Sequence, residues 1–378
     1  MKQKKALIVG GSNGIGLAFA QTLSLNYDKI IIADKVKPEI ELEKTEFINV
    51  NLTDCDFSLF QNYQDIDLLI ITAGFGRVSG FHTQTHKEIE NSFKVNAMAV
   101  TSIIKEYYDK LSSSEELNCI VMGSIAGLIS SPLFSLYAAT KAAVCRFIES
   151  VNIELEMSGS KNRILNVSPG SLKGTKFNGG ENSPENLKTL CEEILTKSQN
   201  KETLFIPDFN TIYKNVLERY KENPHQFGID SYNYKINANR LNDKPQVKVG
   251  YLSGTFDLFH IGHLNLLKKA KEHCDYLIVG VHFSGAWKGK ETFIPFEERV
   301  EILKSIKYVD KVVMSDPEDS DSWEKYHYDR LFVGSDYKGT DRFKKYEEFF
   351  KDKNVEIIYF PYTKGTSSTQ LRDSISKS

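Results

Sequence analysis

The stretch Val9-Gly-Gly-Ser-Asn-Gly-Ile-Gly16 follows a short apolar run, Lys5–Val9, and leads into a helical pattern over Ile15–Leu25. Glycines between a strand and a helix let a pyrophosphate approach the amides at the positive end of the helix dipole. An ordinary tight turn has a similar composition, and it is the position between a strand and a helix that favours phosphate binding. We therefore expect this turn to bind a nucleotide cofactor through Gly10, Ser12, Asn13, Gly14, Ile15 and Gly16.

Strand-like runs and helical patterns alternate along the whole chain. Amphipathic stretches such as Ala138–Glu156 separate the β-branched runs Lys29–Ala33, Leu68–Thr72, Cys119–Met122 and Arg163–Val167. A polar stretch ends at Gln246, and the alternation then restarts. Such alternation predicts parallel sheets covered by helices on both faces. We expect an α/β chain of two doubly wound domains: a Rossmann-type domain at 1–240, a linker at 241–246 and a smaller Rossmann-like domain at 247–378.

The composition excludes several classes of protein. A chain of 378 residues, 40% hydrophobic and 26% charged, has the material for two globular cores. The net charge of −2 argues against a broad nucleic-acid-binding surface, and no apolar stretch approaches the ~18 residues of a membrane span. The basic start leads into a strand, which is not typical of a signal peptide. Five cysteines without Cys-x-x-Cys spacing indicate reduced thiols of a cytoplasmic protein and no zinc cluster.

Asp34 ends the second strand-like run, where a carboxylate can accept hydrogen bonds from a ribose diol and repel a 2′-phosphate. This position favours NAD over NADP. Lys35 and Lys37 lie close enough in sequence to leave the choice between the two cofactors open.

Tyr137 and Lys141 are one helical turn apart and share a helix face. An ammonium beside a phenol stabilises the phenolate, so that Tyr137 can act as an acid or base nearer neutral pH. Ser124 precedes Tyr137 by thirteen positions, just after the run that ends at Met122. Taken singly, these residues also fit a surface pair and a turn residue, and the combination is what favours a catalytic site.

Together with Asn96, these elements resemble the short-chain dehydrogenase/reductase family over roughly residues 1–240. The resemblance implies that Tyr137 transfers the proton, Ser124 orients the carbonyl, Lys141 holds the nicotinamide ribose and Asn96 supports a proton relay. It further implies cofactor contacts at Asn51, Ala73, Gly74, Pro169 and Gly170. Thr72 and Asn51 depart from the residues usual in the family, and Thr175 stands one position late after Pro169-Gly170.

The substrate of this domain is less visible in the sequence. By the same resemblance, the segments around 74–86 and 171–180 border the substrate, and they contribute Arg77, Lys173 and Lys176. These cations could hold a phosphate group, although solvated surface lysines are the competing interpretation.

The second domain opens with a run from a strand through Gly254-Thr-Phe-Asp257 to His260-Ile-Gly-His263. The two histidines are three positions apart, so both imidazoles can face one ligand. Near a helix start they could donate hydrogen bonds to a triphosphate and stabilise the leaving pyrophosphate. As an isolated pair, they could equally bind a metal or cap a helix.

The surrounding motifs resemble the cytidylyltransferase family that includes glycerol-3-phosphate cytidylyltransferase, over about residues 247–375. The resemblance implies attack of an alcohol phosphate on CTP, carried with Mg²⁺, and release of pyrophosphate. Contacts to CTP are expected from Gly254, Thr255, Phe256, Asp257, His260, His263, Lys288, Lys290, Arg299, Thr363, Ser367, Ser368 and Thr369, with His260, His263 and Lys288 catalytic. Tyr362 stands where the family usually has arginine, and Ser284 where aspartate is common, so the acceptor stays open.

The two resemblances together imply a polyol phosphate as the shared intermediate. Glycerol 3-phosphate is abundant in cells, so a dedicated reductase favours another ketose phosphate, such as ribulose 5-phosphate converted into CDP-ribitol for capsule or teichoic-acid polymers. Two alternatives stay open: a triose or hexulose phosphate giving CDP-glycerol or a CDP-hexitol, and one silent domain that only binds nucleotide. Both families imply a homo-oligomer.

Overall fold

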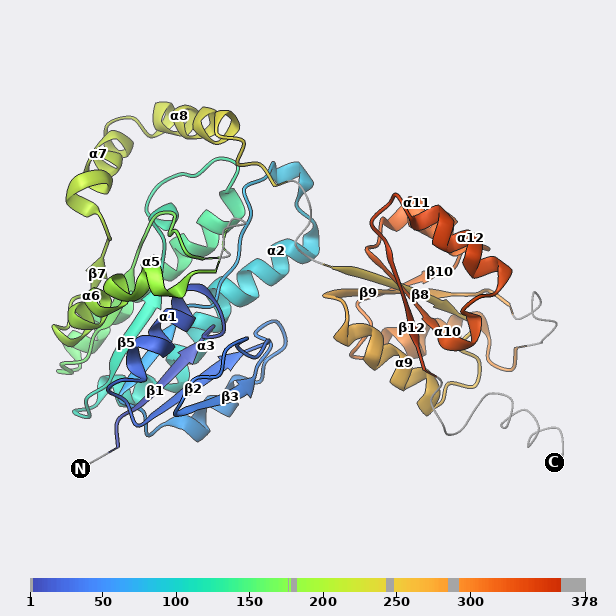
Figure 1. Cartoon of the computed structure of the whole chain (residues 1–378), viewed down its shortest axis with the longest axis horizontal. Helices are drawn as coiled ribbons and strands as arrows, with labels where there is room; N and C mark the ends of the chain where they lie inside the picture. The colour runs from blue at the N-terminus through green and yellow to red at the C-terminus, as the bar shows by residue number, and fades with distance from the viewer. Residues whose placement is uncertain (1–2, 176, 178–181, 243–247, 285–291, 362–378) are drawn as a thin grey trace. The chain divides into compact units, whose positions relative to one another are not determined.

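The computed structural model describes residues 3–175, 177, 182–242, 248–284 and 292–361. The chain divides into two compact units, Met1–Lys244 and Pro245–Ser378, and the division falls inside the linker predicted at 241–246. Each unit has a sheet of its own (Figure 1).

The first unit is built on a seven-stranded parallel sheet in the order β3-β2-β1-β4-β5-β6-β7. The strand order reverses between β1 and β4, and such a switch point opens a crevice at the carboxyl ends of the strands. The strands are β1 Lys5–Val9, β2 Lys29–Asp34, β3 Thr45–Asn49, β4 Leu68–Ile71, β5 Asn118–Met122, β6 Ile164–Val167 and β7 Leu204–Phe205.

Helices cover both faces of this sheet because successive strand residues point to opposite sides. In β1, Leu7 and Val9 join the core on one face, and Ala6 and Ile8 join the core on the other. The helices are α1 Gly14–Leu23, α2 His86–Phe93, α3 Ala99–Glu106, α4 Tyr108–Ser112, α5 Ser135–Met157, α6 Lys188–Gln199, α7 Lys214–Glu222 and α8 Pro224–Asn237.

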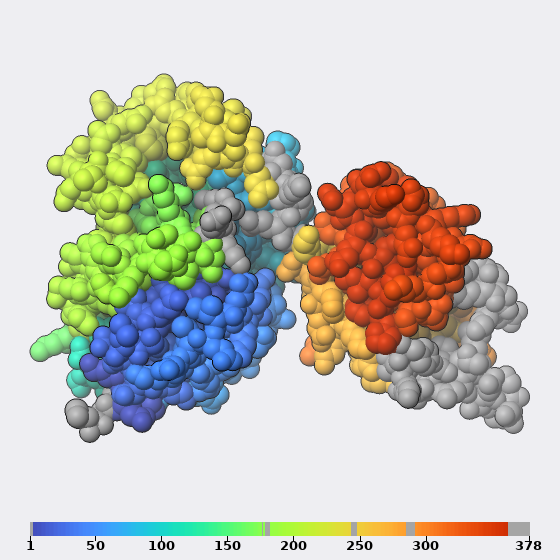
Figure 2. Space-filling model, viewed as in Figure 1, coloured from blue at the N-terminus to red at the C-terminus, as the bar shows by residue number. Residues whose placement is uncertain are grey.

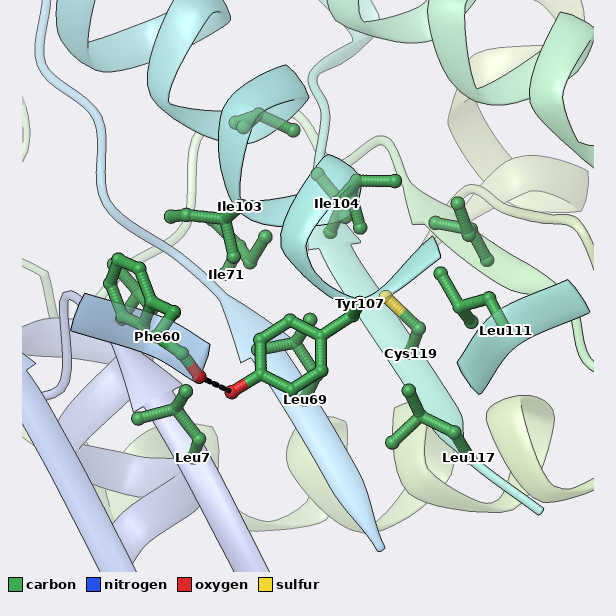
Figure 3. Close-up of a cluster of buried hydrophobic side chains, with 14 of the residues drawn as sticks. Leu7, Phe60, Leu69, Ile71, Ile103, Ile104, Tyr107, Leu111, Leu117 and Cys119 are labelled. Atoms are coloured by element: carbon green, nitrogen blue, oxygen red, sulfur yellow. Dashed lines mark hydrogen bonds between the residues drawn. The ribbon is translucent and has the colours of Figure 1, made fainter. Parts of the chain in front are cut away.

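One face of the sheet packs around Tyr107, which follows α3 and is completely buried (Figure 3). Its ring packs in an apolar cluster, and its hydroxyl donates to the carbonyl oxygens of Tyr63, at 3.0 Å, and Phe60, at 3.4 Å. A buried phenol needs such an acceptor, since an unpaired hydroxyl in an apolar core is costly. The bond therefore ties the segment before β4 to the helical layer.

The second unit is a five-stranded parallel sheet in the order β10-β9-β8-β11-β12, again with two separate cores on its faces. Its strands are β8 Val249–Gly254, β9 Tyr276–Val281, β10 Lys311–Met314, β11 Arg330–Gly334 and β12 Glu356–Phe360. Its helices are α9 Ile261–Glu272, α10 Phe296–Lys304, α11 Asp319–Tyr326 and α12 Asp341–Phe350.

The prediction of two parallel α/β domains is confirmed. Among the described residues of both units, no helix combines the length and the apolar character needed to cross a membrane.

Candidate active sites

The glycine turn after β1 has no room for a side chain at two positions. Gly10 has a φ of +88°, and a Cβ there would lie 2.5 Å from the amide nitrogen of Ala73. A Cβ on Gly16 would lie 2.1 Å from the carbonyl oxygen of Gly10. Thr72, which departs from the family pattern, donates its hydroxyl to that same carbonyl at 2.9 Å. The threonine thus secures the turn against the end of β4.

Several groups at this turn fit a dinucleotide. The Gly14 amide donates to Oδ1 of Asn182 at 2.8 Å, so an amide oxygen occupies the place that a phosphate oxygen would take. The Ser12 hydroxyl is buried and has no partner among the described residues. The Asp34 carboxylate accepts the Ser12 amide at 3.1 Å, which fixes it at the end of β2 for a ribose diol. Asn13 is the N-cap residue of α1, and Ile15 is buried behind the turn.

The other expected cofactor contacts lie at strand ends of the same sheet. Ala73 and Gly74 follow β4, and Pro169 and Gly170 follow β6. Asn51 is exposed, and its side chain accepts from the Thr53 amide and hydroxyl, which closes a local turn.

Tyr137, Lys141 and Ser124 come together in the first unit. Lys141 is buried, its Nζ lies 5.7 Å from the centroid of the Tyr137 ring, and it donates to the Met122 carbonyl at 2.7 Å. Ser124 is placed by the turn after β5, where its hydroxyl accepts the Ala126 amide at 3.2 Å. A hydrogen bond also links Ser124 to the Tyr137 side chain. The phenol, the hydroxyl and the ammonium therefore occupy one site at the ends of β4 and β5.

Burial governs the electrostatics of this site. It raises the pKa of Tyr137 well above its ordinary value, and the hydrogen bond to Ser124 only partly opposes the rise. Burial also lowers the pKa of Lys141 to about 8. The pKa of Tyr137 is therefore raised and does not lie nearer neutral pH as expected, because desolvation outweighs any stabilisation of the phenolate by Lys141.

Asn96 lies in a π-helical turn, Lys94–Met98, between α2 and α3. Its side chain exchanges two hydrogen bonds with the Phe75 backbone and donates to the Thr140 hydroxyl at 3.1 Å. A single π-turn inside a helix often marks a functional position, because it redirects a backbone carbonyl. Gly74 passes so close that a Cβ there would lie 3.3 Å from Oδ1 of Asn96 and 3.4 Å from Nζ of Lys141.

Two aromatic side chains beside Tyr137 were not predicted from the sequence. The Phe134 ring stacks on the Tyr137 ring with centroids 4.4 Å apart, and Phe177 lies 5.2 Å away. Gly76 leaves room for the phenol, since a Cβ there would lie 2.6 Å from the ring. These contacts hold the phenol in an apolar surrounding. No short sequence motif predicts them.

Arg77, expected to hold a phosphate, is not free to do so, because the fold already satisfies its guanidinium. The side chain is buried and pairs with Glu88 at 2.8 Å. Its remaining donors bind the Thr83 hydroxyl and carbonyl and the Asn242 carbonyl. The guanidinium therefore joins three chain segments. Lys173 is exposed, and Lys176 lies outside the described residues.

In the second unit, His260 and His263 flank the start of α9. Nδ1 of His260 accepts the Gly262 amide at 3.0 Å, and the two imidazoles stack with centroids 4.0 Å apart. Since Nδ1 of His260 is an acceptor, the proton of the neutral ring lies on Nε2. Nδ1 of His263 is buried and has no partner among the described residues. This pair is suited to contacting the oxygens of a triphosphate.

Burial lowers the pKa of both histidines. For His263 the value falls to about 4, because desolvation and the nearby His260 outweigh the opposing influence of Asp257. His260 is shifted in the same direction by desolvation. Both rings are therefore neutral hydrogen-bonding groups at pH 7, and neither supplies a formal charge.

Asp257 and Arg299, both expected to contact CTP, bind backbone groups of the same unit. Asp257 is buried and accepts the amides of Phe293 and Ile294 at 2.9–3.1 Å. Arg299 is also buried, and its guanidinium donates to the carbonyls of Ile294, Thr255, His282 and Phe283. Because the Arg299 guanidinium donates to both the Thr255 and His282 carbonyls, it holds the turn at Thr255 beside the end of β9.

The Phe256 ring is buried in the apolar core and lies edge-on to the His263 ring, with centroids 5.3 Å apart. Phe256 and Leu258 have φ values of +53° and +49°, which are strained for non-glycine residues. The hydrogen bonds of Asp257 between them help to maintain that backbone. Gly254 ends β8 and Thr255 follows it.

The remaining residues expected to contact CTP lie outside the described residues: Lys288, Lys290, Thr363, Ser367, Ser368 and Thr369. Tyr362 also lies outside them. Within the described part of the chain, no group of three or more histidine, cysteine or acidic side chains is placed to hold a metal ion.

The two units match two families. The short chain dehydrogenase family model matches residues 4–186, and the cytidylyltransferase-like family model matches residues 251–374. Glycerol-3-phosphate cytidylyltransferase of Staphylococcus aureus is 36% identical over 126 residues, which cover 32% of this chain and 90% of that protein. An uncharacterized oxidoreductase of Saccharomyces cerevisiae is 26% identical over 194 residues, or 47% of this chain and 62% of the relative. A short-chain dehydrogenase structure from Streptomyces avermitilis shares the fold, with a TM-score of 0.51 at 18% identity over 61% of this chain and 99% of that one.

Replacing Arg77 by methionine is expected to lower the stability of the first unit. The variant leaves the Glu88 carboxylate buried without its partner, and breaking a buried pair costs about 3 to 5 kcal/mol. Differential scanning calorimetry should show a lower unfolding temperature for this unit. Unchanged stability together with a raised KM for a phosphorylated substrate would instead restore Arg77 as a substrate ligand.

Carbonyl reduction is expected to slow as the pH rises through about 8. The pKa of Lys141 is about 8, so its ammonium is present below that pH and is lost above it. The phenolate left when Tyr137 gives up its proton then lacks a neighbouring cation. A pH profile of kcat/KM measures the effect, and Lys141→Arg, which stays charged, should move the fall to higher pH. An unchanged profile in that variant would contradict the assignment.

The second unit is expected to lose stability as the pH falls from about 6.5 towards 4. The folded pKa of His263 lies below its ordinary value of 6.5, so the unfolded chain takes up a proton first and gains stability by doing so. Tryptophan fluorescence during urea unfolding reports on this unit, since Trp287 and Trp323 both belong to it. His263→Phe should flatten the dependence, whereas His273→Gln should keep it. Equal slopes in both variants would overturn the explanation.

Proposed function

Because the chain belongs to the cytidylyltransferase-like family and carries a short-chain dehydrogenase domain ahead of that part, we propose that it catalyses two consecutive reactions. The first reduces a ketose phosphate to a polyol phosphate with NADH or NADPH. The second couples that polyol phosphate to CTP, carried with Mg²⁺, and gives a CDP-polyol and pyrophosphate. The observation that carries the proposal is the presence on one chain of the Tyr137–Lys141–Ser124 site and the His260–His263 site.

In the first reaction, the nicotinamide cofactor supplies the hydride when it is bound. Tyr137 gives its proton to the carbonyl oxygen, and Ser124, hydrogen bonded to Tyr137, orients that oxygen. The buried Lys141 ammonium favours the phenolate that remains. Asp34 at the end of β2 favours NADH, since a carboxylate would repel a 2′-phosphate.

In the second reaction, neutral His260 and His263 donate hydrogen bonds to phosphate oxygens and stabilise the charge that develops on the leaving pyrophosphate. The start of α9 adds backbone amides and the helix dipole. We propose that the remaining contacts to the triphosphate come from Lys288, Lys290 and the segment from Thr363 to Thr369. Such a transfer depends mainly on positioning, which suits a site of imidazoles, amides and lysines.

The intermediate is proposed to be a pentitol phosphate formed from ribulose 5-phosphate, which gives CDP-ribitol for capsule or teichoic-acid-type polymers. The relative in Staphylococcus aureus is a glycerol-3-phosphate cytidylyltransferase, an enzyme named for another short polyol phosphate. We further propose that the protein works in the cytoplasm as a homo-oligomer and takes small phosphorylated substrates.

A crossed assay with two variants tests the proposal. The purified protein is given ribulose 5-phosphate, dihydroxyacetone phosphate or fructose 6-phosphate with NADH or NADPH, and then CTP and Mg²⁺. Wild type should oxidise the nicotinamide and release pyrophosphate only after CTP is added. Tyr137→Phe should lose the first step yet still convert supplied ribitol 5-phosphate, and His263→Ala should show the reverse. Nicotinamide oxidation without any CTP-dependent pyrophosphate would refute the coupled reactions.

A further inference from the structure

The α7–α8 hairpin, residues 209–242, lies beyond the part of the first unit that matches the short chain dehydrogenase family, which ends at residue 186. Figure 1 shows α7 and α8 outside the layers of sheet and helix, and Figure 2 shows them at the surface of the unit. The contacts of this hairpin reach the walls of the Tyr137 site.

One end of the hairpin rests on the turn after β6. The hydroxyl of Tyr213 packs on Gly170 so closely that a Cβ there would lie 1.6 Å from the oxygen. The neighbouring Pro169 accepts the Ile125 amide at 3.0 Å, and Ile125 directly follows Ser124. Tyr213 is thus two contacts away from the serine that orients the carbonyl.

The other end rests on the loop before α5. Nζ of Lys235 donates to the Ser131 hydroxyl at 2.9 Å, to the Pro132 carbonyl at 2.7 Å and to the Ser231 hydroxyl at 3.0 Å. The same loop continues into Phe134, whose ring stacks on Tyr137. The hairpin therefore spans from the Ser124 side of the site to the Tyr137 side.

Two cations of this hairpin, Lys235 and Arg240, have no counter-ion among the residues that the structure describes. Lys235 is only 7% exposed, and Arg240 is half-buried, with its amide bonded to the Lys235 carbonyl at 3.1 Å. Neither forms an ion pair in the part of the chain that the structure describes, whereas Asp230 on α8 pairs with Arg219 at 2.7 Å. Tyr213 lies near charges of both signs, since Asp208 raises its pKa and Arg240 lowers it.

These two positive charges lie close enough to oppose each other. Burial and the charge of Arg240 lower the pKa of Lys235 to about 8. The Arg240 guanidinium has no hydrogen-bond partner among the described residues. An anion placed between the two cations would remove their repulsion and accept hydrogen bonds from this guanidinium. The Ser131 and Ser231 hydroxyls, which accept from Lys235, keep their own protons for donation to such an anion.

We propose that Arg240 and Lys235, with the hydroxyls of Ser131 and Ser231, bind the phosphate group of the keto substrate at the entrance to the Tyr137 site. This inference rests on the proposed reduction of a ketose phosphate, and it replaces the phosphate site expected at Arg77. Arg240 contacts the phosphate directly, and Lys235 adds charge and positions the two hydroxyls.

The first test compares a phosphorylated ketose with its dephosphorylated form. Arg240→Met should raise the KM for the phosphate ester at least tenfold more than the KM for the free ketose, with kcat changed less than twofold. Arg240→Lys should recover part of the loss, and Lys235→Gln should act in the same direction as Arg240→Met. Lys221→Met removes an exposed cation from α7 and serves as the control. Equal effects of Arg240→Met on both substrates would overturn the proposal.

The second test needs no turnover, so it separates this inference from the proposed function. Inorganic phosphate is titrated into the full-length protein with bound NADH, whose fluorescence reports on the first unit. Wild type and Lys221→Met should show the same saturable change, and Arg240→Met should need at least tenfold more phosphate. If wild type reduces no ketose phosphate, the proposed function fails while this titration still decides the site. Identical titration of Arg240→Met and wild type would place the phosphate elsewhere.

Discussion

The burial of the Lys141 ammonium is the constraint on which the first domain's site depends. A buried charge is costly unless donors and acceptors surround it, and here the end of β5 supplies the Met122 carbonyl at 2.7 Å. A Cβ on Gly74, after β4, would lie only 3.4 Å from Nζ, so glycine leaves the ammonium more room. One charged group therefore fixes how α5 meets the ends of two adjacent strands, and the same low-polarity surrounding raises the pKa of Tyr137. The phenol keeps its proton until a substrate arrives to accept it, which suits the reducing direction.

The residues that the sequence could predict are those whose neighbours are close along the chain. Tyr137 and Lys141 share a helix face, His260 and His263 flank one helix start, and the glycines lie in a single turn. The residues whose contacts the sequence did not indicate have the opposite character. Arg77, Asp257 and Arg299 carry charges that suit a ligand, but each is satisfied by groups that the fold brings from elsewhere. Side-chain charge alone does not reveal whether the folded chain already provides the partner, because that depends on contacts between distant segments.

The strands and helices also divide into those that the sequence predicts and those that it does not. The central strands β1, β4 and β5 are buried on both faces, so their apolar runs are continuous and easy to recognise. The edge strand β3 is half-exposed, and the two-residue β7 is too short to leave a pattern. The π-turn at Asn96 has no sequence signal of its own, since it arises from the way α2 and α3 join over the site. The architecture was therefore predictable from the core, whereas the edges and the local distortions depend on tertiary packing.

The two domains use one architectural device for different chemistry. In each, a parallel strand leads through a turn to a helix start, and the nucleotide phosphates are expected there. The groups that would distinguish substrates lie outside these turns: in the first domain they are on a hairpin beyond residue 186, packed through Lys235 and Tyr213 on the catalytic loops. Chemistry that must stay constant is built on the sheet, where backbone geometry is rigid. Recognition of a particular phosphate ester rests on an added element, which can change without disturbing the phenol, the ammonium or the glycine turn.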